Sequence, residues 1–320
     1  MAYSDAAAVL RSDINALVEE AGRATEFYIA ERVMPIWTVN EQNGQWPKFR
    51  LAKGELLNDD VSLRMPGSAY QRATRAYESD TYDCKDRGLE ELVDDTYRNN
   101  VARFFDAEVA AARQVLRQIR LGLEVRVSAA IINASNFTAT NPAVDYTEAN
   151  IATINFPKDV MDAVDRLNAK GVVPNTIVLS GPLANRIKRS TIFQNFVRGN
   201  LPAGQPVIAV DSDIGRAFAD LGITSVLIGR ASKNSAKKGQ AFTAASVWAN
   251  THIWVGAVES GDPMNGGAGR VVVWNKEGGI YVTETYREEQ RRSNIVRVRH
   301  NTAEKVVDGT AGELITTNYS

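Results

Sequence analysis

The chain has 320 residues, of which 44% are hydrophobic and 23% are charged. This is the composition of a globular protein long enough for about two domains and a sizeable core. Its 37 Lys and Arg residues nearly balance its 38 Asp and Glu residues, so the formal net charge is −1. The balance argues against a function dominated by a strongly basic nucleic-acid patch, and against a polyanionic mimic.

The single cysteine, Cys84, excludes an intrachain disulfide and a multi-thiolate metal site, and it fits a reducing compartment. Charges at Asp5, Arg11 and Asp13 interrupt the region where a signal peptide needs an apolar core. No window approaches the roughly 18 uncharged apolar residues of a membrane-spanning helix. We therefore expect a soluble protein that is not exported through a cleaved signal.

The first 40 residues predict an N-terminal arm. A short helix is expected there, capped by Ser4 or Asp5. Its apolar residues recur at helical spacing and are Ala8, Val9 or Leu10, Ile14, Leu17 and Val18. A second amphipathic piece, Phe27–Val33, ends before Pro35, because the residue preceding a proline favours extended geometry.

A turn-rich segment follows the arm. Residues 46–52 (WPKFRLA) alternate in polarity as a strand does, and residues 69–83 form a second alternating run. Two strands around a turn-rich middle predict a long hairpin. Its apolar content is too low for a core of its own, so we expect its aromatic residues Trp46, Tyr70 and Tyr77 to be covered by a neighbouring molecule.

The strongest periodic signal runs from Thr96 to Ala130, after two good helix N-terminal residues, Asp94 and Asp95. The apolar positions recur at 3.6-residue spacing and are Val101, Phe104, Phe105, Ala112, Val115, Leu116, Ile119 and Leu123. A single helix over this range would be about 50 Å long at 1.5 Å per residue. Gly122 is its candidate weak point.

The rest of the chain mixes helices and strands. Helices are expected over residues 156–171, closed by Gly171, and over residues 182–197, with Pro182 in the first turn. The expected strands are residues 175–181, 206–211, 225–231, 252–258, 270–275, 279–288, 293–302 and 313–319. The fold class predicted by this order is α+β.

Each candidate catalytic or cofactor-binding motif lacks residues that its chemistry requires. Cys84 lies beside two aspartates, whose charge raises the pKa of a thiol and makes it less reactive. The chain has only His252 and His300, and no G-x-S-x-G turn that would place a nucleophile near either. The glycine-rich segment 261–270 lacks the Gly-Lys-Ser/Thr of a phosphate-binding loop, and a strand follows it. We expect no catalytic residue, metal or cofactor, which leaves an enzyme as the weakest hypothesis.

Two charge clusters each have more than one interpretation. The acidic cluster comprises Glu78, Asp80, Asp83, Asp86, Glu90, Glu91, Asp94 and Asp95. Its spacing favours a solvated face and a helix N-terminus over a divalent-cation loop, and in an assembly it would meet arginines of a neighbour. The basic cluster comprises Arg287, Arg291, Arg292, Arg297 and Arg299. Because no aromatic residues interleave with these arginines, an intersubunit ion-pair surface is favoured over a nucleic-acid surface.

This order of parts resembles the major capsid proteins of tailed bacteriophages, which have the HK97-like fold. The segments that carry the resemblance are RGLEELVDDTYRNN (87–100), LRQIRLGLEVRVSAAIIN (116–133), VPNTIVLSGPLANRIKRS (173–190), AASVWANTHIWVG (244–256), VVVWNKEGGIYVTETY (271–286) and VRHNTAEKVVDGTAGELITT (298–317). The resemblance covers about residues 25–320 and rests on the order of the parts more than on an invariant motif.

The resemblance implies a division into an N-terminal arm (1–40), an extended loop (41–91), a peripheral domain with a spine helix (92–150 and 266–320) and an axial domain (151–265). It implies self-assembly, through pentamers and hexamers, into an icosahedral shell in the virion that encloses double-stranded DNA without sequence specificity. Assembly in the bacterial host cytoplasm, with scaffolding, portal and decoration proteins as further partners and no membrane, belongs to the same expectation. An encapsulin-type compartment shell, which resembles the same fold, is the alternative.

Overall fold

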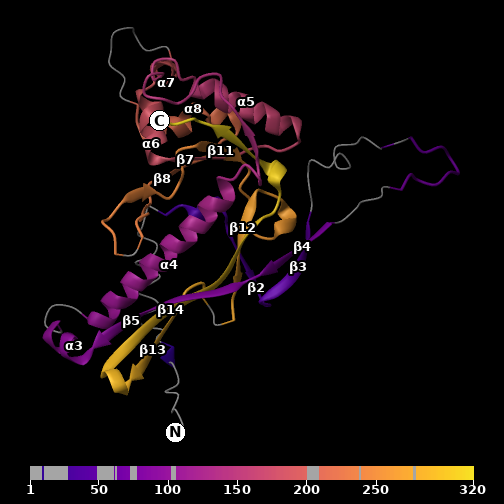
Figure 1. Ribbon diagram of the computed structural model, residues 1–320. Coiled ribbons are helices and arrows are strands. Elements are labelled where there is room, and N and C mark those ends of the chain that lie inside the picture. Colours follow the sequence, from indigo (N-terminus) through magenta and orange to yellow (C-terminus); the bar gives the residue numbers. More distant parts are fainter. Residues whose placement is uncertain are drawn as a thin grey trace.

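The computed structural model describes residues 9–10, 28–48, 61, 63–72, 78–101, 106–199, 209–237, 239–276 and 279–320. Figure 1 shows two sheets at opposite ends of a long helix, and a segment that projects to one side of both. Within the described residues, no helix is both long and apolar enough to cross a membrane.

The first sheet has six strands within the described residues. In order they are β1 (Val9–Leu10), β13 (Val282–Glu288), β14 (Ser293–Val306), β12 (Gly269–Trp274) and β2 (Ile36–Val39), with β5 (Lys85–Asp94) paired to β14. Strand β14 pairs with β13 through its first half and with β12 through its second, while β5 runs antiparallel along residues 293–302. Val296 and Val298 of β14 are buried against the long helix, so this sheet and that helix share a core.

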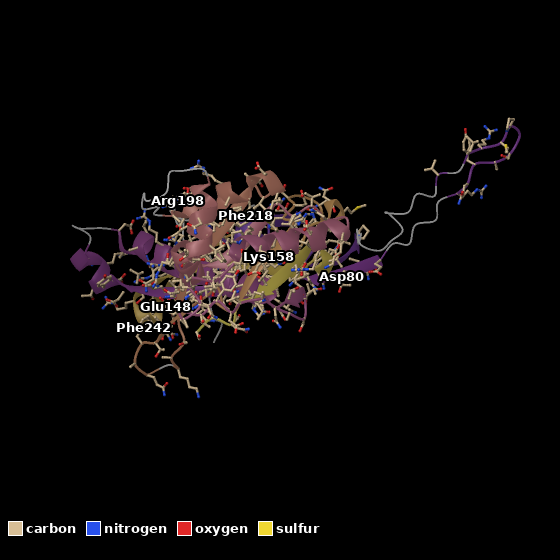
Figure 2. The ribbon with its side chains drawn as sticks, turned by 90° about the horizontal axis from the view of Figure 1, so that it is seen from above. Asp80, Glu148, Lys158, Arg198, Phe218 and Phe242 are labelled. Carbon is tan, nitrogen blue, oxygen red and sulfur yellow. The ribbon has the colours of Figure 1, made fainter. Side chains whose placement is uncertain are left out.

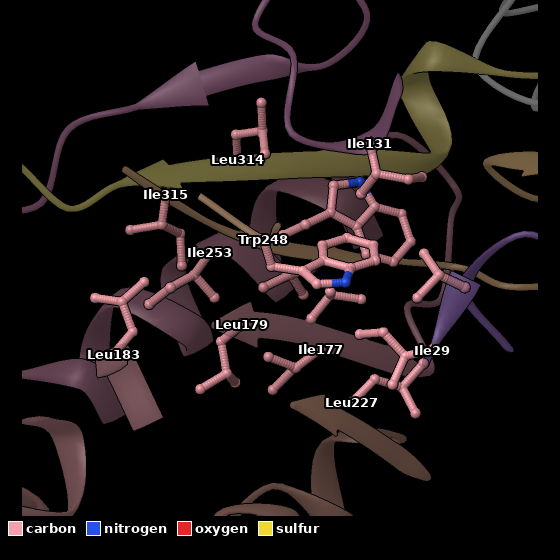
Figure 3. Packing of buried hydrophobic residues seen from close by; sticks show 14 of the residues in the cluster. Ile29, Ile131, Ile177, Leu179, Leu183, Leu227, Trp248, Ile253, Leu314 and Ile315 are labelled. Atoms are coloured by element: carbon pink, nitrogen blue, oxygen red, sulfur yellow. The ribbon is translucent and has the colours of Figure 1, made fainter. Parts of the chain in front are cut away.

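The second sheet contains β6 (Thr138–Thr140), β15 (Gly312–Thr316), β11 (His252–Gly256), β7 (Thr176–Ser180) and β8 (Ser225–Gly229), in that order. The helices of this half are α5 (Phe156–Ala169), α6 (Gly181–Arg189), α7 (Thr191–Arg198) and α8 (Asp211–Ala217). Figure 3 shows side chains of β7, β8, β11 and β15 packed with Trp248, Ile29 and Ile131. The largest core of the molecule lies here.

Two antiparallel hairpins and four short 3-10 helices complete the described elements. The hairpins are β3 (Asn43–Lys48) with β4 (Glu78–Asp83), and β9 (Ser232–Asn234) with β10 (Ala244–Ser246). The 3-10 helices are η2 (Ala219–Leu221), η3 (Pro263–Asn265), η4 (Glu289–Arg291) and η5 (Gly309–Ala311).

Seven of the eight strands predicted from residue 175 onwards are confirmed as strands, and so is the helix predicted over residues 156–171. Helix α5 ends as expected: Gly171 has a φ of +76°, and the Val172 amide returns to the Leu167 carbonyl at 3.0 Å. Strands β6 and β15, which the predicted boundaries assign to the peripheral domain, lie in the second sheet, where β15 pairs with β11 of the predicted axial domain and β6 pairs with β15. The domain boundaries themselves stay a prediction.

The predicted single helix over residues 96–130 is wrong, because two helices occupy this range. They are α3 (Asp95–Val101) and α4 (Ala107–Ile131). Asp106 has an extended backbone and accepts hydrogen bonds from the Glu108 and Val109 amides at 2.9 and 3.4 Å. Its carboxylate caps a new helix N-terminus and so ends the continuity that the apolar spacing suggested.

The predicted helix over residues 182–197 is also divided, here at Ser190. Its hydroxyl caps α7 at the Phe193 amide (3.5 Å) and donates to the Ile154 carbonyl (2.9 Å). The predicted strand 206–211 is wrong at its end, because Asp211 begins α8; residues 206–208 lie outside the described residues.

The predicted N-terminal helix is wrong at Val9 and Leu10, which form β1 and pair with Thr285 and Glu284 of β13. Hydrogen bonding to the edge of a sheet outweighs local helix preference at these two positions. The other residues of that predicted helix lie outside the described residues. The second piece forms only the short helix α2 (Ala30–Val33), which ends before Pro35 as expected.

A buried carboxylate ties the long helix to the rest of the chain. Glu124 of α4 accepts hydrogen bonds from the Ile29 and Ala30 amides (3.0 and 2.8 Å), at the start of α2, and from Trp248 Nε1 (2.6 Å). Burial raises the pKa of Glu124, and the three donors oppose that rise by favouring its ionised form. Glu124 thus joins α2, α4 and the segment before β11.

Candidate intersubunit surfaces

The base of the projecting hairpin is packed within its own chain. Strands β3 and β4 pair from Asn43 opposite Asp83 to Lys48 opposite Glu78. Trp46 is buried, stacks on Tyr82 at 6.0 Å between ring centroids, and meets the edge of Trp37 at 6.0 Å. The structure gives Trp46 a role inside its own chain, and its predicted contact with a neighbour stays a prediction.

The far end of this hairpin extends away from the rest of the molecule, as Figures 1 and 2 show. Its apolar side chains are Val61, Leu63, Met65 and Tyr70, with exposed fractions of 91%, 92%, 68% and 73%. We call residues 61–72 the tip. The Arg64 guanidinium lies 4.8 Å from the Tyr70 ring centroid, and its Nε donates to the Ser68 carbonyl at 2.7 Å. Tyr77 lies outside the described residues.

Exposed apolar side chains also occur on β5 and α3, on both faces of the strand. Leu89, Leu92 and Tyr97 are 39%, 44% and 53% exposed. Among the described strands, β5 pairs with β14 alone, so its outer backbone edge is unpaired. Carboxylates of the acidic cluster, including Asp86 and Glu90, are exposed on the same strand. We call this edge strand with the start of α3 the β5 surface; its exposed side chains are apolar and mostly acidic, with Lys85 also exposed.

The structure brings the two charge clusters together within one chain. Arg287 forms a bidentate pair with Asp95, with both N–O distances at 2.7 Å, and this hydrogen bonding lowers the pKa of Asp95. Arg297 Nε lies 2.6 Å from Glu90 Oε1, because residues 297 and 90 are direct partners in the β14–β5 register. An intersubunit role for Arg287 and Arg297 stays a prediction.

The other three arginines of the basic cluster are arranged differently. Arg299 pairs with Glu284 at 2.9 Å, and Arg291 pairs with Glu288 at 3.3 Å. Arg292 is exposed at the turn between β13 and β14, where its φ is +47°. Arg291 and Arg292 are thus the members of the cluster most open to another molecule.

Cys84 and His300 are buried, and His252 is half-buried. The Cys84 thiol lies 3.7 Å from the Val272 carbonyl oxygen, and burial raises its pKa to about 11. His300 stacks on Tyr281, and burial, with Arg126 and Arg87 nearby, lowers its pKa to about 3. Within the described residues, no three His, Cys, Asp or Glu side chains are arranged to hold a metal ion.

The glycine-rich segment 261–270 is a loop between β11 and β12, as predicted, and it surrounds an arginine from its own sequence. Arg270 is fully buried and donates to the carbonyls of Gly261 (3.1 Å), Gly266 (2.9 Å) and Gly269 (2.9 Å). Sequence reasoning missed this role. The signal in the sequence was an arginine at the end of a glycine-rich segment. Because glycine has no side chain, such a segment leaves room for its backbone carbonyls to surround a guanidinium.

No protein-family model and no curated protein matches the chain. Solved structures do. A phage-related protein from Bordetella bronchiseptica is 18% identical, with a TM-score of 0.70 and 98% of each chain covered. The capsid structure of cyanophage P-SCSP1u is 10% identical, with a TM-score of 0.55, covering 92% of this chain and 88% of that one. An encapsulin complex from Synechococcus elongatus is 11% identical, with a TM-score of 0.51, covering 89% and 85%.

Structural likeness at identities this low establishes the fold alone. The chain has the α+β fold that phage capsid proteins and an encapsulin share over nearly their whole length. This is the HK97-like fold, as the sequence predicts.

Proposed function

We propose that the chain is the major capsid protein of a tailed bacteriophage, which self-assembles through pentamers and hexamers into an icosahedral shell around double-stranded DNA. The observation that carries the proposal is the tip. The tip stands away from the core (Figure 2), and its Leu63, Met65 and Tyr70 side chains have most of their surface exposed. Each Å² of apolar surface removed from water contributes about 25 cal/mol, and a group of exposed apolar side chains on a projecting segment is typical of a contact surface.

A second copy of the chain is the occupant that fits the tip. Between Val61 and Arg72 the sequence has two arginines and no acidic residue. The β5 surface has the complementary character, with exposed leucines among carboxylates. A contact between two different surfaces of identical chains is heterologous, and heterologous contacts close into rings where the rotation between neighbouring copies closes. Many such contacts per shell give high avidity even where each is weak.

The role is structural rather than catalytic. Cys84 and His300 are buried, and the glycine-rich loop is filled by Arg270. The shell of the virion is the proposed location, after assembly in the host cytoplasm. Scaffolding, portal and decoration proteins and packaged DNA are the further partners of this role.

An encapsulin-type compartment shell is the second candidate, favoured by the likeness to the Synechococcus elongatus encapsulin over 89% of the chain. Both candidates assemble, so the contents separate them. Particles purified from the natural source contain DNA under the capsid proposal and an enzyme cargo under the alternative.

Sedimentation velocity tests the self-assembly. The test variant carries Leu63→Ser, Met65→Ser and Tyr70→Ser, and the control is Val173→Ser, since Val173 is 70% exposed in the second half of the molecule. We expect the wild-type chain and the control to form large closed particles, and the tip variant to remain in small species. Wild-type chains that stay monomeric would contradict the proposal, and particles from the tip variant would contradict the role of the tip.

A further inference from the structure

The β9–β10 hairpin is a second projection from the molecule, and hydrogen bonds from one of its own side chains hold its turn. Its strands pair from Ser232 opposite Ser246 to Asn234 opposite Ala244. Asn234 Oδ1 accepts from the Ala236 and Thr243 amides at 3.0 and 3.1 Å. These bonds fix the turn that presents Lys237 and Phe242 to the outside.

The charge of this region is one-sided. Between Asp220 and Glu259 the sequence contains Arg230 and three lysines but no acidic residue. Arg230 pairs with Asp211, outside the hairpin. Among the described residues, no carboxylate lies within ion-pair distance of Lys233 or Lys237. The hairpin is therefore positively charged in a chain whose net charge is −1.

This arrangement differs from that of the basic cluster on β13 and β14. Arg287, Arg297 and Arg299 are engaged by carboxylates of their own chain. Lys233 and Lys237 have no such neutralising partner among the described residues. Phe242, in the turn of the same hairpin, is 73% exposed, and Figure 2 shows it on this projection. An exposed aromatic side chain next to unpaired cations marks a surface built for contact rather than for the core.

We propose that the β9–β10 hairpin binds the phosphate backbone of duplex DNA without sequence specificity, and so marks the inner face of the shell. The proposal rests on the proposed function, which supplies the DNA. Lysine ammonium groups near phosphates release condensed counterions, and this electrostatic contribution carries non-specific binding. Two lysines per copy bind DNA weakly, but the many copies in a shell bind the same DNA together and so raise the overall avidity.

The experiment measures binding of the full chain to a fluorescent mixed-sequence duplex by anisotropy, over a series of salt concentrations below those that drive assembly. The test variant is Lys233→Gln with Lys237→Gln. The matched control is Lys158→Gln with Lys170→Gln, which removes the same charge from α5 and its C-terminal cap; Lys158 already pairs with Asp162. Circular dichroism compares the folding of all three chains.

We expect the slope of log K against log salt to fall by about 2 in the hairpin variant, because each phosphate contact contributes about 0.9. The control should keep the wild-type slope. Equal slopes in the two variants, or a wild-type chain that does not bind the duplex, would overturn the proposal. The proposal would also be overturned if the chain bound poly-glutamate as tightly as the duplex and the same two lysine substitutions abolished that binding. That result would favour an acidic protein partner.

Sedimentation of the same three chains, under conditions that permit assembly, keeps this proposal separate from the function on which it rests. A hairpin variant that assembles but has lost DNA binding supports both. A wild-type chain that assembles but does not bind DNA defeats the hairpin proposal alone, whereas a chain that binds DNA but never assembles defeats the proposed function.

Discussion

The Glu124 carboxylate offers the sharpest test of how the long helix is tied to the rest of the chain. Its Oε1 accepts from the Ile29 amide (3.0 Å) and from Trp248 Nε1 (2.6 Å), and its Oε2 accepts from the Ala30 amide (2.8 Å). Glu124→Gln preserves the shape and one acceptor oxygen. The new amide group then faces the Ala30 N–H with a donor instead of an acceptor.

The cost follows from this geometry. A hydrogen bond to a charged group contributes about 1.5–3 kcal/mol, and a buried donor left without an acceptor costs about 1–3 kcal/mol. Relief from burying a charge offsets part of this loss. We expect Glu124→Gln to lower the free energy of unfolding by about 2–4 kcal/mol.

Two measurements check this value. Urea unfolding followed by circular dichroism gives the change in stability, and hydrogen exchange reports the Ala30 amide directly. A loss of about 2 kcal/mol corresponds to roughly 30-fold faster exchange where local opening limits the rate. The control, Glu289→Gln, removes a carboxylate that is 82% exposed and should change stability by less than about 0.5 kcal/mol. Unchanged stability and exchange in Glu124→Gln would refute the reasoning.

Three further predictions concern burial. Cys84, with a pKa near 11, should react with iodoacetamide in urea but not in the folded chain at neutral pH, and rapid labelling of folded protein would contradict its burial. His300 has a folded-state pKa of about 3, below its unfolded value, so its contribution to stability is complete above about pH 6.5 and is lost as pH falls. Between about pH 6.5 and 4.5, the free energy of unfolding measured in urea should fall by about 2–3 kcal/mol more in the wild-type chain than in His300→Gln. An identical fall in both chains would show that His300 is not its cause. A Cβ at Gly229 would collide with the Trp248 ring, so Gly229→Ala should cost about 1–3 kcal/mol in a thermal melt. Gly122→Ala, where the new Cβ meets only Arg126 Nη1 at 3.3 Å, should stabilise by about 0.5–1 kcal/mol, and a reversed order of the two melts would contradict the packing.

Local signals predicted most of the strands, the end of one helix and the start of another, because turns and helix caps depend on residues that are adjacent in sequence. Gly171 and Pro182 are such signals. The divisions at Asp106 and Ser190 were missed although the capping residues were present. Apolar spacing continued across both positions, and the choice between a cap and a continuous helix depends on tertiary contacts such as that of Ser190 with Ile154.

The candidate surfaces were harder to predict, because their contacts depend on strand register. Arg297 meets Glu90 only because β5 pairs with β14 in one register, across 207 positions of sequence. The burial of Trp46 and Arg270 likewise depends on segments that are distant in sequence or folded around them. Composition identified the charged and aromatic groups but not their partners.

Electron microscopy of the full chain expressed alone tests the central claim most directly. We predict closed particles in which the tip of each copy lies against the β5 surface of a neighbour. A chain that remains monomeric, or particles in which the tip folds back onto its own copy, would contradict this account.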